Sequence, residues 1–245
     1  MTGRVAIVTG GSLGLGRAIA RELIGRDYKV AIFARGQASL DAAAEELGDV
    51  LAVSVDVTSE TSIGRGFATV DERLGPVGTL INNAAIYRPF DIDNATAGRV
   101  EPLVQTNLCG PIYCMREAVG RMRALGGGDI VNISSESTRR ATPFFTVYTA
   151  TKAALEAMTT MMGEELRSDG IRTMIFRVGR MDSDGARSMT VPDNILPRFL
   201  EAVEKSGAGH WTGPGMATST AARALVDALQ TARDARLELL ELRSA

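Results

Sequence analysis

The chain's most reactive pattern is a tyrosine and a lysine four residues apart, Tyr148 and Lys152, at the start of an apolar helical segment. Residues at this spacing lie on one face of a helix, one turn apart. A free phenol has a pKa of about 10 and is a poor acid or base at neutral pH, but a neighbouring ammonium favours the phenolate and lowers that pKa. The pair therefore predicts a tyrosine that exchanges a proton with a substrate.

A serine upstream of this pair is a further candidate for the same chemistry. Ser135 ends the apolar run 129–135, which is typical of a buried strand. A hydroxyl at a strand end could hold a carbonyl oxygen while Tyr148 exchanges its proton. Taken alone, Tyr-x-x-x-Lys also fits a half-buried ring beside a solvated amine, so its interpretation depends on the elements that must position it.

Composition bounds those elements. The 245 residues are 45% hydrophobic and 23% charged, which suits one large α/β domain spanning 1–245. A net charge of −2 gives no argument for nucleic acid or an anionic membrane. No apolar run reaches the ~18 residues that span a bilayer, and the first residues lead directly into a strand, without a signal peptide. We therefore expect a cytoplasmic protein.

The cysteines give no sign of a disulfide or metal site. Cys109 and Cys114 fall in an expected helix, and the chain has one histidine. Two thiols and one imidazole make neither a disulfide framework nor a usual zinc set. We expect reduced, mostly packing cysteines and no metal.

The first strand and the glycines after it predict a nucleotide site. Residues 5–8 are continuously apolar, as in a strand buried on both faces. They lead into TGGSLGLG and then into helical periodicity. Glycines at Gly10, Gly14 and Gly16 let the backbone approach a pyrophosphate, and the helix N-terminus offers it unpaired N–H groups. The spacing differs from G-x-G-x-x-G, so a merely tight strand–helix turn is the alternative.

The end of the second strand, 29–34, favours NADP over NAD. An NAD site would place a carboxylate here for the ribose 2′-hydroxyl, but the first one is Asp41. Arg35 stands at the strand exit instead, and its planar guanidinium matches a 2′-phosphate. A solvated surface arginine is the alternative.

Later strands extend the same pattern. Asp56 ends the strand 51–57 and could accept a hydrogen bond from an adenine amine. After the strand 79–82 comes Asn-Asn-Ala-Ala, where amides could lock the sheet edge and small residues leave room for a nucleotide. Strands that alternate with helices at this pitch predict an α/β fold: a doubly wound parallel sheet with right-handed crossovers and helices on both faces.

In this order, the motifs resemble the short-chain dehydrogenase/reductase family over nearly the whole chain. They are the glycine loop, Asp56, residues 82–85, Asn107, Ser135, Tyr148 and Lys152. The resemblance implies an NADP(H)-dependent oxidoreductase that interconverts a carbonyl and a secondary alcohol of a small molecule. Ser135 would hold the oxyanion, Tyr148 would be the acid/base, and Lys152 would lower its pKa and hold the nicotinamide ribose. Asn107 would be the fourth catalytic residue, supporting a water that relays protons to the lysine.

The expected cofactor contacts gather at the glycine loop, the strand ends and the turn after the strand 172–177. They are Gly10, Ser12, Leu13, Gly14, Leu15, Gly16, Arg35, Asp56, Val57, Asn83, Ala84, Ala85, Tyr148, Lys152, Val178, Gly179 and Met181.

Three positions depart from the family's usual pattern. Ala85 replaces a glycine, and Val178 replaces the proline of Pro-Gly, which loosens the turn and restores a backbone N–H. Glu136 follows the serine where a small residue is usual. With Arg139 and Arg140, it either lines the substrate entrance or belongs to a solvated loop.

Residues 180–216 contain no confident sheet strand and carry several methionines and aromatics. Loops of this length are uncommon unless they bind or cover something. The resemblance makes this segment the substrate lid over an adaptable apolar pocket; the alternative is that it simply covers the sheet. His210, beside Trp211, is expected to be a surface residue.

The C-terminal segments complete the expected fold and assembly. Residues 218–231 predict an amphipathic helix, and 237–242 allow either a closing strand or a helix. Apolar helical faces at 100–125 and 148–167 predict a homodimer or homotetramer. Two other functions stay open: a 3-oxoacyl reductase whose Arg139 and Arg140 meet an acidic carrier, and a catalytically silent NADP(H)-binding module.

Overall fold

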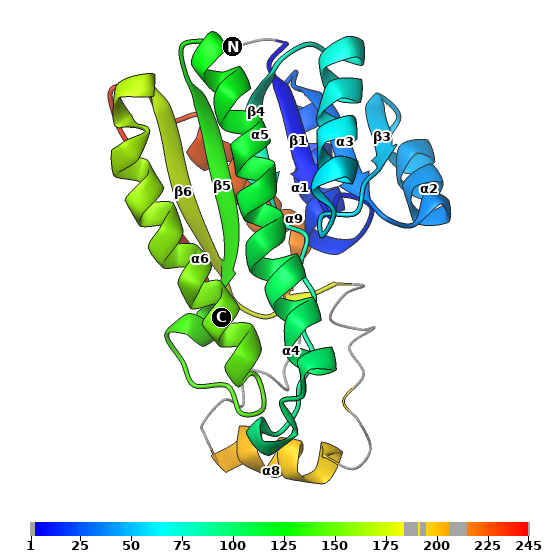
Figure 1. The fold of residues 1–245 in the computed structure, drawn as a ribbon, viewed down its shortest axis with the longest axis vertical. Coiled ribbons are helices and arrows are strands. Elements are labelled where there is room, and N and C mark those ends of the chain that lie inside the picture. The colour runs from blue at the N-terminus through cyan, green and yellow to red at the C-terminus, as the bar shows by residue number, and fades with distance from the viewer. Residues whose placement is uncertain (1–2, 184–190, 192–194, 206–214, 245) are drawn as a thin grey trace.

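The computed structural model describes residues 3–183, 191, 195–205 and 215–244. They form a seven-stranded parallel sheet in the order β3-β2-β1-β4-β5-β6-β9 (Figure 1). The strands are β1 Val5–Thr9, β2 Lys29–Ala34, β3 Val50–Ser54, β4 Val77–Asn82, β5 Gly128–Ser135, β6 Ile171–Val178 and β9 Leu239–Leu242. The predicted doubly wound sheet is confirmed, and the closing segment, left open between strand and helix, is a strand.

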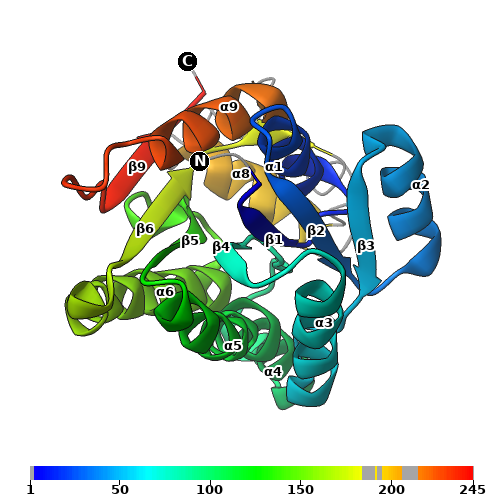
Figure 2. The same cartoon turned by 90° about the horizontal axis from the view of Figure 1, so that it is seen from above.

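Helices cover both faces of this sheet (Figure 2). On one face lie α1 Gly14–Ile24, α2 Gln37–Leu47 and α9 Thr218–Leu229; on the other lie α3 Glu60–Arg73, α5 Gly110–Ala124 and α6 Thr146–Glu165. Side chains of a strand alternate between faces. Ala6 and Val8 of β1 accordingly join the first core, while Val5 and Ile7 join the second. Such two-sided burial explains the unbroken apolar run that predicted the strand.

The carboxyl ends of the parallel strands meet at one edge of the sheet. The chain builds outward from β1 to β3, then returns to the other side of β1 with β4. In open α/β sheets this reversal leaves a crevice beyond the strand ends, where ligands bind. Every strand end expected to contribute to the site, from the glycine loop after β1 to the turn after β6, opens toward that edge.

One helix is interrupted on the way to β5. α4 Ala97–Val104 passes into a π-helical segment, Gln105–Cys109, before α5 begins. A π-helical turn widens the helix locally and is frequent at functional sites. It carries Asn107, the residue to which the family resemblance gives the fourth catalytic role.

The expected lid segment contains more regular structure than predicted. β7 Met181–Asp182 pairs in parallel with β8 Met216–Ala217, and α8 Leu196–Lys205 lies beyond the carboxyl ends of the sheet (Figure 1). A two-residue pairing is too short to leave a periodic signal in sequence. His210 and Trp211 lie outside the described residues.

Two negative findings apply to the described residues. None of their helices has both the length and the apolar character needed to cross a bilayer. Nor do three or more of their His, Cys, Asp and Glu side chains gather in a way that could hold a metal ion.

Candidate active site

Two cavities meet at the carboxyl ends of the strands. The larger holds about 1440 Å³ of space, open mouth included, and runs from the glycine loop to Lys152. The smaller, about 950 Å³, lies between the ends of β5 and β6 and α8. The residues that line both are Tyr87, Ser134, Tyr148, Val178, Met181 and Ser183. Tyr148 thus belongs to the wall that the two cavities share.

Helix α6 and strand β5 bring the proton-transfer candidates together. Tyr148 lies in the first turn of α6 and Lys152 one turn later. Ser135, the last residue of β5, lines the smaller cavity and makes a side-chain hydrogen bond with Tyr148. Its Oγ also accepts a hydrogen bond from the N–H of Ser137 at 3.2 Å. The sequence-predicted trio therefore converges, with Ser135 on the smaller cavity and Lys152 on the larger.

The electrostatics of this trio differ from the prediction. Burial raises the pKa of Tyr148 to about 12; the Ser135 hydrogen bond opposes that rise and Tyr87 adds to it. The ammonium of Lys152 donates to the carbonyl of Ile133 at 2.7 Å, and burial lowers its pKa to about 8. Within the described residues, Lys152 is not among the groups that lower the phenol pKa. The predicted lowering of the Tyr148 pKa is therefore not found, because burial of the phenol has the largest effect on that pKa.

Asn107 supports the site from behind the cavity walls. Its Oδ1 accepts from the N–H of Ile86 at 2.8 Å, and its Nδ2 donates to the Ile86 carbonyl at 2.8 Å and to the Thr151 hydroxyl at 3.3 Å. The side chain is fully buried. It therefore joins the chain after β4 to α6 beside Lys152.

The glycine loop is shaped for close approach and an anion. Gly10 has φ +64°, and a Cβ there would lie 2.9 Å from the Cα of Ala84. Helix α1 begins at Gly14 with no side-chain cap and no acidic residue in its first turn. Its first N–H groups and its dipole therefore favour a negative group at that end.

Two expected cofactor residues do something else. A Cβ on Gly16 would lie 2.3 Å from the carbonyl oxygen of Gly10, so this glycine lets α1 pack against its own loop. Gly179 lines the smaller cavity. Neither lines the larger cavity, whereas every other expected cofactor residue does; the structure describes all of them.

Amide side chains lock the sheet edge, as predicted. The Nδ2 of Asn83 donates to the carbonyls of Thr9 and Gly10, at 3.0 and 3.2 Å. The Thr9 hydroxyl accepts from the N–H groups of Asn83 and Ala84, each at 3.0 Å. At the last residue of β4, Asn82 donates to Asn132 of β5 at 2.8 Å and joins these two strands. The bonds of Thr9 and Asn83 hold the glycine loop against the end of β4.

The far end of the larger cavity carries a cation and a carboxylate. Arg35 is exposed at the exit of β2. Asp56 accepts from the N–H and hydroxyl of Thr58, at 2.9 and 2.8 Å. Burial acts to raise the pKa of Asp56, but the Thr58 hydrogen bonds and the charge of Arg35 outweigh it and keep that pKa below its usual value. Thr58 and Ser39 line the cavity too and were missed. Ser39 lies in the first turn of α2, directly after the strand exit that carries Arg35, which was a usable signal.

The smaller cavity is mostly apolar and aromatic. Phe145 packs edge-on against Tyr148 with ring centroids 5.8 Å apart, and against Phe199 of α8 at 6.2 Å. Leu200 and Val203, also on α8, line the same space. The expectation that this segment contributes an apolar pocket agrees with these contacts.

The match to known families decides the chain's identity. Residues 4–193 match the family model described as short chain dehydrogenase. The chain belongs to the short-chain dehydrogenase/reductase family. It is an oxidoreductase with the Rossmann-like fold of that family.

Named relatives span several reductase activities. The chain is 35% identical to the uncharacterized oxidoreductase YgfF of Escherichia coli over 71% of this chain and 75% of that one. It is 32% identical to the 3-oxoacyl-[acyl-carrier-protein] reductase of Bos taurus over 82% and 87% of the two chains. The crystal structure of actinorhodin polyketide ketoreductase with NADPH superposes with a TM-score of 0.86, at 25% identity, covering 99% of this chain and 98% of that one.

Glu136, which replaces the small residue usual in short-chain dehydrogenases/reductases, has a defined place in the structure. Glu136 is buried at 3% exposure, lines the smaller cavity and accepts from the N–H of Arg180 at 3.1 Å. Arg139 and Arg140 are exposed. Each of the two alternatives for this loop therefore holds for part of it. The carboxylate of Glu136 lines the cavity, and the arginines are solvated.

Proposed function

We propose that the protein is an NADP(H)-dependent oxidoreductase that interconverts a carbonyl and a secondary alcohol, with Tyr148 as its acid/base. One observation carries this proposal: Tyr148 lies on the wall common to both cavities. Substrate would occupy the smaller cavity beside Ser135, and the dinucleotide the larger one beside Lys152. A bound nicotinamide supplies or accepts the hydride.

The chain's own residues would manage the oxygen and its proton. Ser135 donates a hydrogen bond to the carbonyl oxygen as negative charge develops there. In the reducing direction, Tyr148 gives its proton to that oxygen. Its raised pKa keeps the phenol protonated at neutral pH, the form that a proton donor needs. Lys152, with a pKa of about 8, is mostly charged at neutral pH and would hold the ribose hydroxyls.

The chemistry of the larger cavity fits an NADP dinucleotide. The uncapped α1 terminus suits the pyrophosphate, Asp56 suits the adenine amine, and exposed Arg35 suits a 2′-phosphate. Titration of the pure protein with NADPH and NADH tests this assignment. Tighter binding of NADH would remove Arg35 from phosphate recognition.

Replacement of Tyr148 by phenylalanine tests the mechanism. Tyr148→Phe keeps the ring and removes the acidic proton, so NADPH binding is retained while turnover of a ketone falls at least ~10²-fold. Binding is measured by fluorescence titration and turnover by NADPH absorbance. Turnover close to wild type would exclude Tyr148 as the acid. Stoichiometric cofactor binding by the wild type, with no turnover over a broad carbonyl panel, would favour the silent binding module.

A carrier-bound 3-oxoacyl substrate is the second candidate. Arg139 and Arg140 are exposed immediately after the loop that carries Ser135 and Glu136, where they could meet an acidic carrier. Salt screens such contacts, so it would inhibit reduction of carrier-bound substrates and leave small ketones unaffected. Equal salt sensitivity of both substrates would argue against a carrier.

We also propose a single cytoplasmic domain, residues 1–245, that forms a homodimer or homotetramer. β9, near the C-terminus, completes the same sheet as β1. Cys109 and Cys114 are free thiols. Ile112 of α5 and Met161 of α6 are 37% and 63% exposed, on helices that cover one face of the sheet. Light scattering on the protein eluted from a size-exclusion column measures its oligomeric state. A monomer would contradict the proposed homodimer or homotetramer.

A further inference from the structure

Behind the site lies a buried ion pair between α6 and β6. The side chain of Arg177, on β6, is 2% exposed. Its Nη2 and Nε donate to the two carboxylate oxygens of Glu156 on α6, at 2.7 and 3.0 Å. Its Nη1 donates to Glu241 of β9 at 2.6 Å. Burial acts to raise the pKa of Glu156, but its hydrogen bonds and the Arg177 charge keep that pKa below its usual value.

The same carboxylate holds the backbone that carries the site serine. Glu156 Oε1 accepts from the hydroxyl of Ser134 at 2.6 Å and lies 2.9 Å from the hydroxyl of Thr138. The Thr138 hydroxyl is also 2.9 Å from the Ser135 carbonyl and accepts from Arg177 Nε at 3.1 Å. Residues on both sides of Ser135 are thus bonded to one ion pair.

Glu156 also lies on the helix that carries the tyrosine. Tyr148, Lys152 and Glu156 follow one another at four-residue intervals on α6, and residues at this spacing share a helix face. The ion pair therefore joins α6, which positions the phenol, to the end of β5, which positions the Ser135 hydroxyl. Both oxygens must reach one substrate oxygen, and misplacement of catalytic groups by about 1 Å costs up to 10²-fold in rate.

We propose that Glu156 and Arg177 are positioning residues, which set the distance between the Tyr148 and Ser135 hydroxyls. This inference rests on the proposed function, in which Ser135 holds the substrate oxygen. Replacing a buried ion pair by apolar residues of similar volume is often neutral or stabilising. Stability alone therefore gives little reason for the pair, whereas its bonds to Ser134 and Thr138 give it a task at the site.

Single and paired substitutions separate positioning from stability. Glu156→Leu leaves the buried Arg177 guanidinium with Glu241 as its one remaining carboxylate partner and lowers Tm by about 10 °C. Adding Arg177→Met removes the incompletely paired charge and restores most of that Tm. If the pair positions Ser135, the double variant still shows kcat for a ketone reduced at least 10-fold, with KM for NADPH unchanged. Recovery of kcat together with Tm would overturn the proposal.

A second variant removes the connection and leaves the ion pair in place. Thr138→Val keeps the side-chain shape and removes the hydroxyl between Arg177, Glu156 and the Ser135 carbonyl. It is expected to lower kcat several-fold with little change in Tm. It decides the question if the double variant does not fold; an unchanged kcat in Thr138→Val would then overturn the proposal.

Hydrogen exchange gives a readout that needs no turnover. The N–H of Ser137 donates to Ser135 Oγ, so its protection reports the position of the serine hydroxyl. In the double variant, exchange over 134–139 should accelerate at least tenfold while 128–133 of the same strand stays protected. Unchanged exchange would contradict positioning. The readout separates this proposal from the proposed function, which Tyr148→Phe tests independently.

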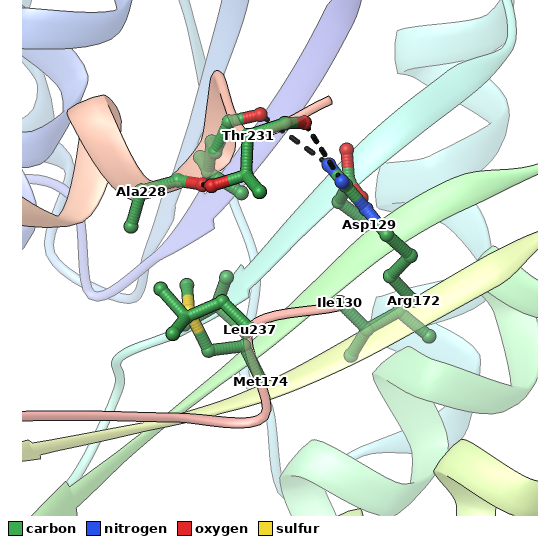
Figure 3. Close-up of a pocket in the computed structure, with 9 residues that line it drawn as sticks. Asp129, Ile130, Arg172, Met174, Ala228, Thr231 and Leu237 are labelled. Carbon is green, nitrogen blue, oxygen red and sulfur yellow. Dashed lines mark hydrogen bonds and ion pairs between the residues drawn. The ribbon is translucent and has the colours of Figure 1, made fainter. Parts of the chain in front are cut away.

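Strand β6 offers a matched control five residues away. Arg172, 13% exposed, pairs with buried Asp129 at 2.8 Å at the opposite end of the sheet (Figure 3). Arg172→Met lowers Tm like the single Glu156 variant, but it leaves kcat and exchange over 134–139 unchanged. If Arg172→Met lowered kcat as much as the double variant, the loss would reflect general loosening, and the proposal would fail.

Discussion

A carboxylate pairs with arginine at each end of the β5–β6 strand pair, but the two ion pairs contact different neighbours. At the amino end, Asp129 is 2% exposed and accepts from Arg4, Arg172 and Arg233 at 2.6, 2.8 and 2.8 Å. At the carboxyl end, Glu156 pairs with Arg177. Three guanidiniums surround one carboxylate at the first end, while the second pairs one carboxylate with one arginine that also reaches Glu241.

At the amino end, arginine donates hydrogen bonds to backbone carbonyl groups. Arg172 donates to carbonyl oxygens in the last turn of α9 and the chain beyond it, at 2.9–3.4 Å (Figure 3). These acceptors are the carbonyls of Leu229, Thr231, Ala232 and Ala235. The last carbonyls of a helix have no partner within it, so Arg172 satisfies groups that would otherwise cost stability. This cluster fastens the C-terminal segment to the sheet.

At the carboxyl end the carboxylate holds hydroxyls instead. Ser134 and Thr138 flank Ser135, and both contact Glu156. One sheet therefore uses the same chemistry twice. Stability should depend most on the end where charges satisfy backbone carbonyls, and rate on the end where they hold side chains beside the cavities. The difference assigns a distinct phenotype to each end, and substitutions can test it.

The largest expected loss of stability is at the amino end. Asp129→Asn leaves three guanidiniums around a neutral amide and should lower the free energy of unfolding by about 3–5 kcal/mol. kcat of the folded protein should stay near wild type, because Asp129 and Ser135 stand at opposite ends of β5. Urea denaturation and ketone turnover at 20 °C measure the two quantities.

A surface pair provides the control for that variant. Asp169 pairs with Arg123, whose side chain is 56% exposed, at 2.8 Å. Removal of an exposed pair costs at most about 1 kcal/mol, so Asp169→Asn should change stability little. A large fall in the kcat of folded Asp129→Asn, alongside its fall in the free energy of unfolding, would contradict the difference proposed between the two ends.

The buried lysine at the carboxyl end should make stability depend on pH. Its pKa is about 8 in the folded protein against an ordinary 10.5. Between those values the unfolded chain binds more protons than the folded one, so stability rises with pH. The full difference corresponds to about 3 kcal/mol. Lys152→Met should abolish that rise between pH 7 and pH 9, as measured by urea denaturation. At higher pH the raised pKa values of Cys114 and Tyr148 act in the opposite direction, because the folded protein then binds more protons than the unfolded chain.

Exposed Lys29, at the amino end of β2, is the matched lysine. Lys29→Met should keep the full wild-type rise in stability over the same pH range. A rise that survives in Lys152→Met would show that other groups cause it, and that Lys152 is hydrated in the folded state.

The sequence predicted the sheet because its strands are buried on both faces. Residues 5–8 and 129–135 are apolar runs bounded by turn residues, and such runs mark strands of a parallel sheet. The two-residue β7 and β8 could not be predicted, because pairing that short leaves no periodicity. The chemistry of the site was predicted from spacing within one helix, where Tyr148 and Lys152 share a face whatever surrounds them.

Interactions across elements were beyond reach of that reasoning. The Lys152 ammonium meets the Ile133 carbonyl because of how α6 packs on β5, and no spacing within α6 encodes that contact. Arg177 did leave a signal, since a charged residue directly after the apolar run 174–176 requires a partner when the strand is buried. Its partner, Glu156, follows Lys152 by four residues on the same helix face. The two observations together make Glu156 a candidate partner, but spacing within α6 does not establish the contact.

The smallest effect is expected at the edge strand. Glu241 on β9 is 26% exposed and accepts from Arg177 at 2.6 Å. Glu241→Gln keeps an acceptor for Arg177 and removes a solvent-screened charge, so it should cost at most about 1 kcal/mol. Because Glu156 still holds Ser134 and Thr138 in this variant, kcat should change less than twofold. A large loss of kcat without loss of stability would move the positioning role outward to β9, and the carboxyl end would then depend on its edge strand much as the amino end depends on α9.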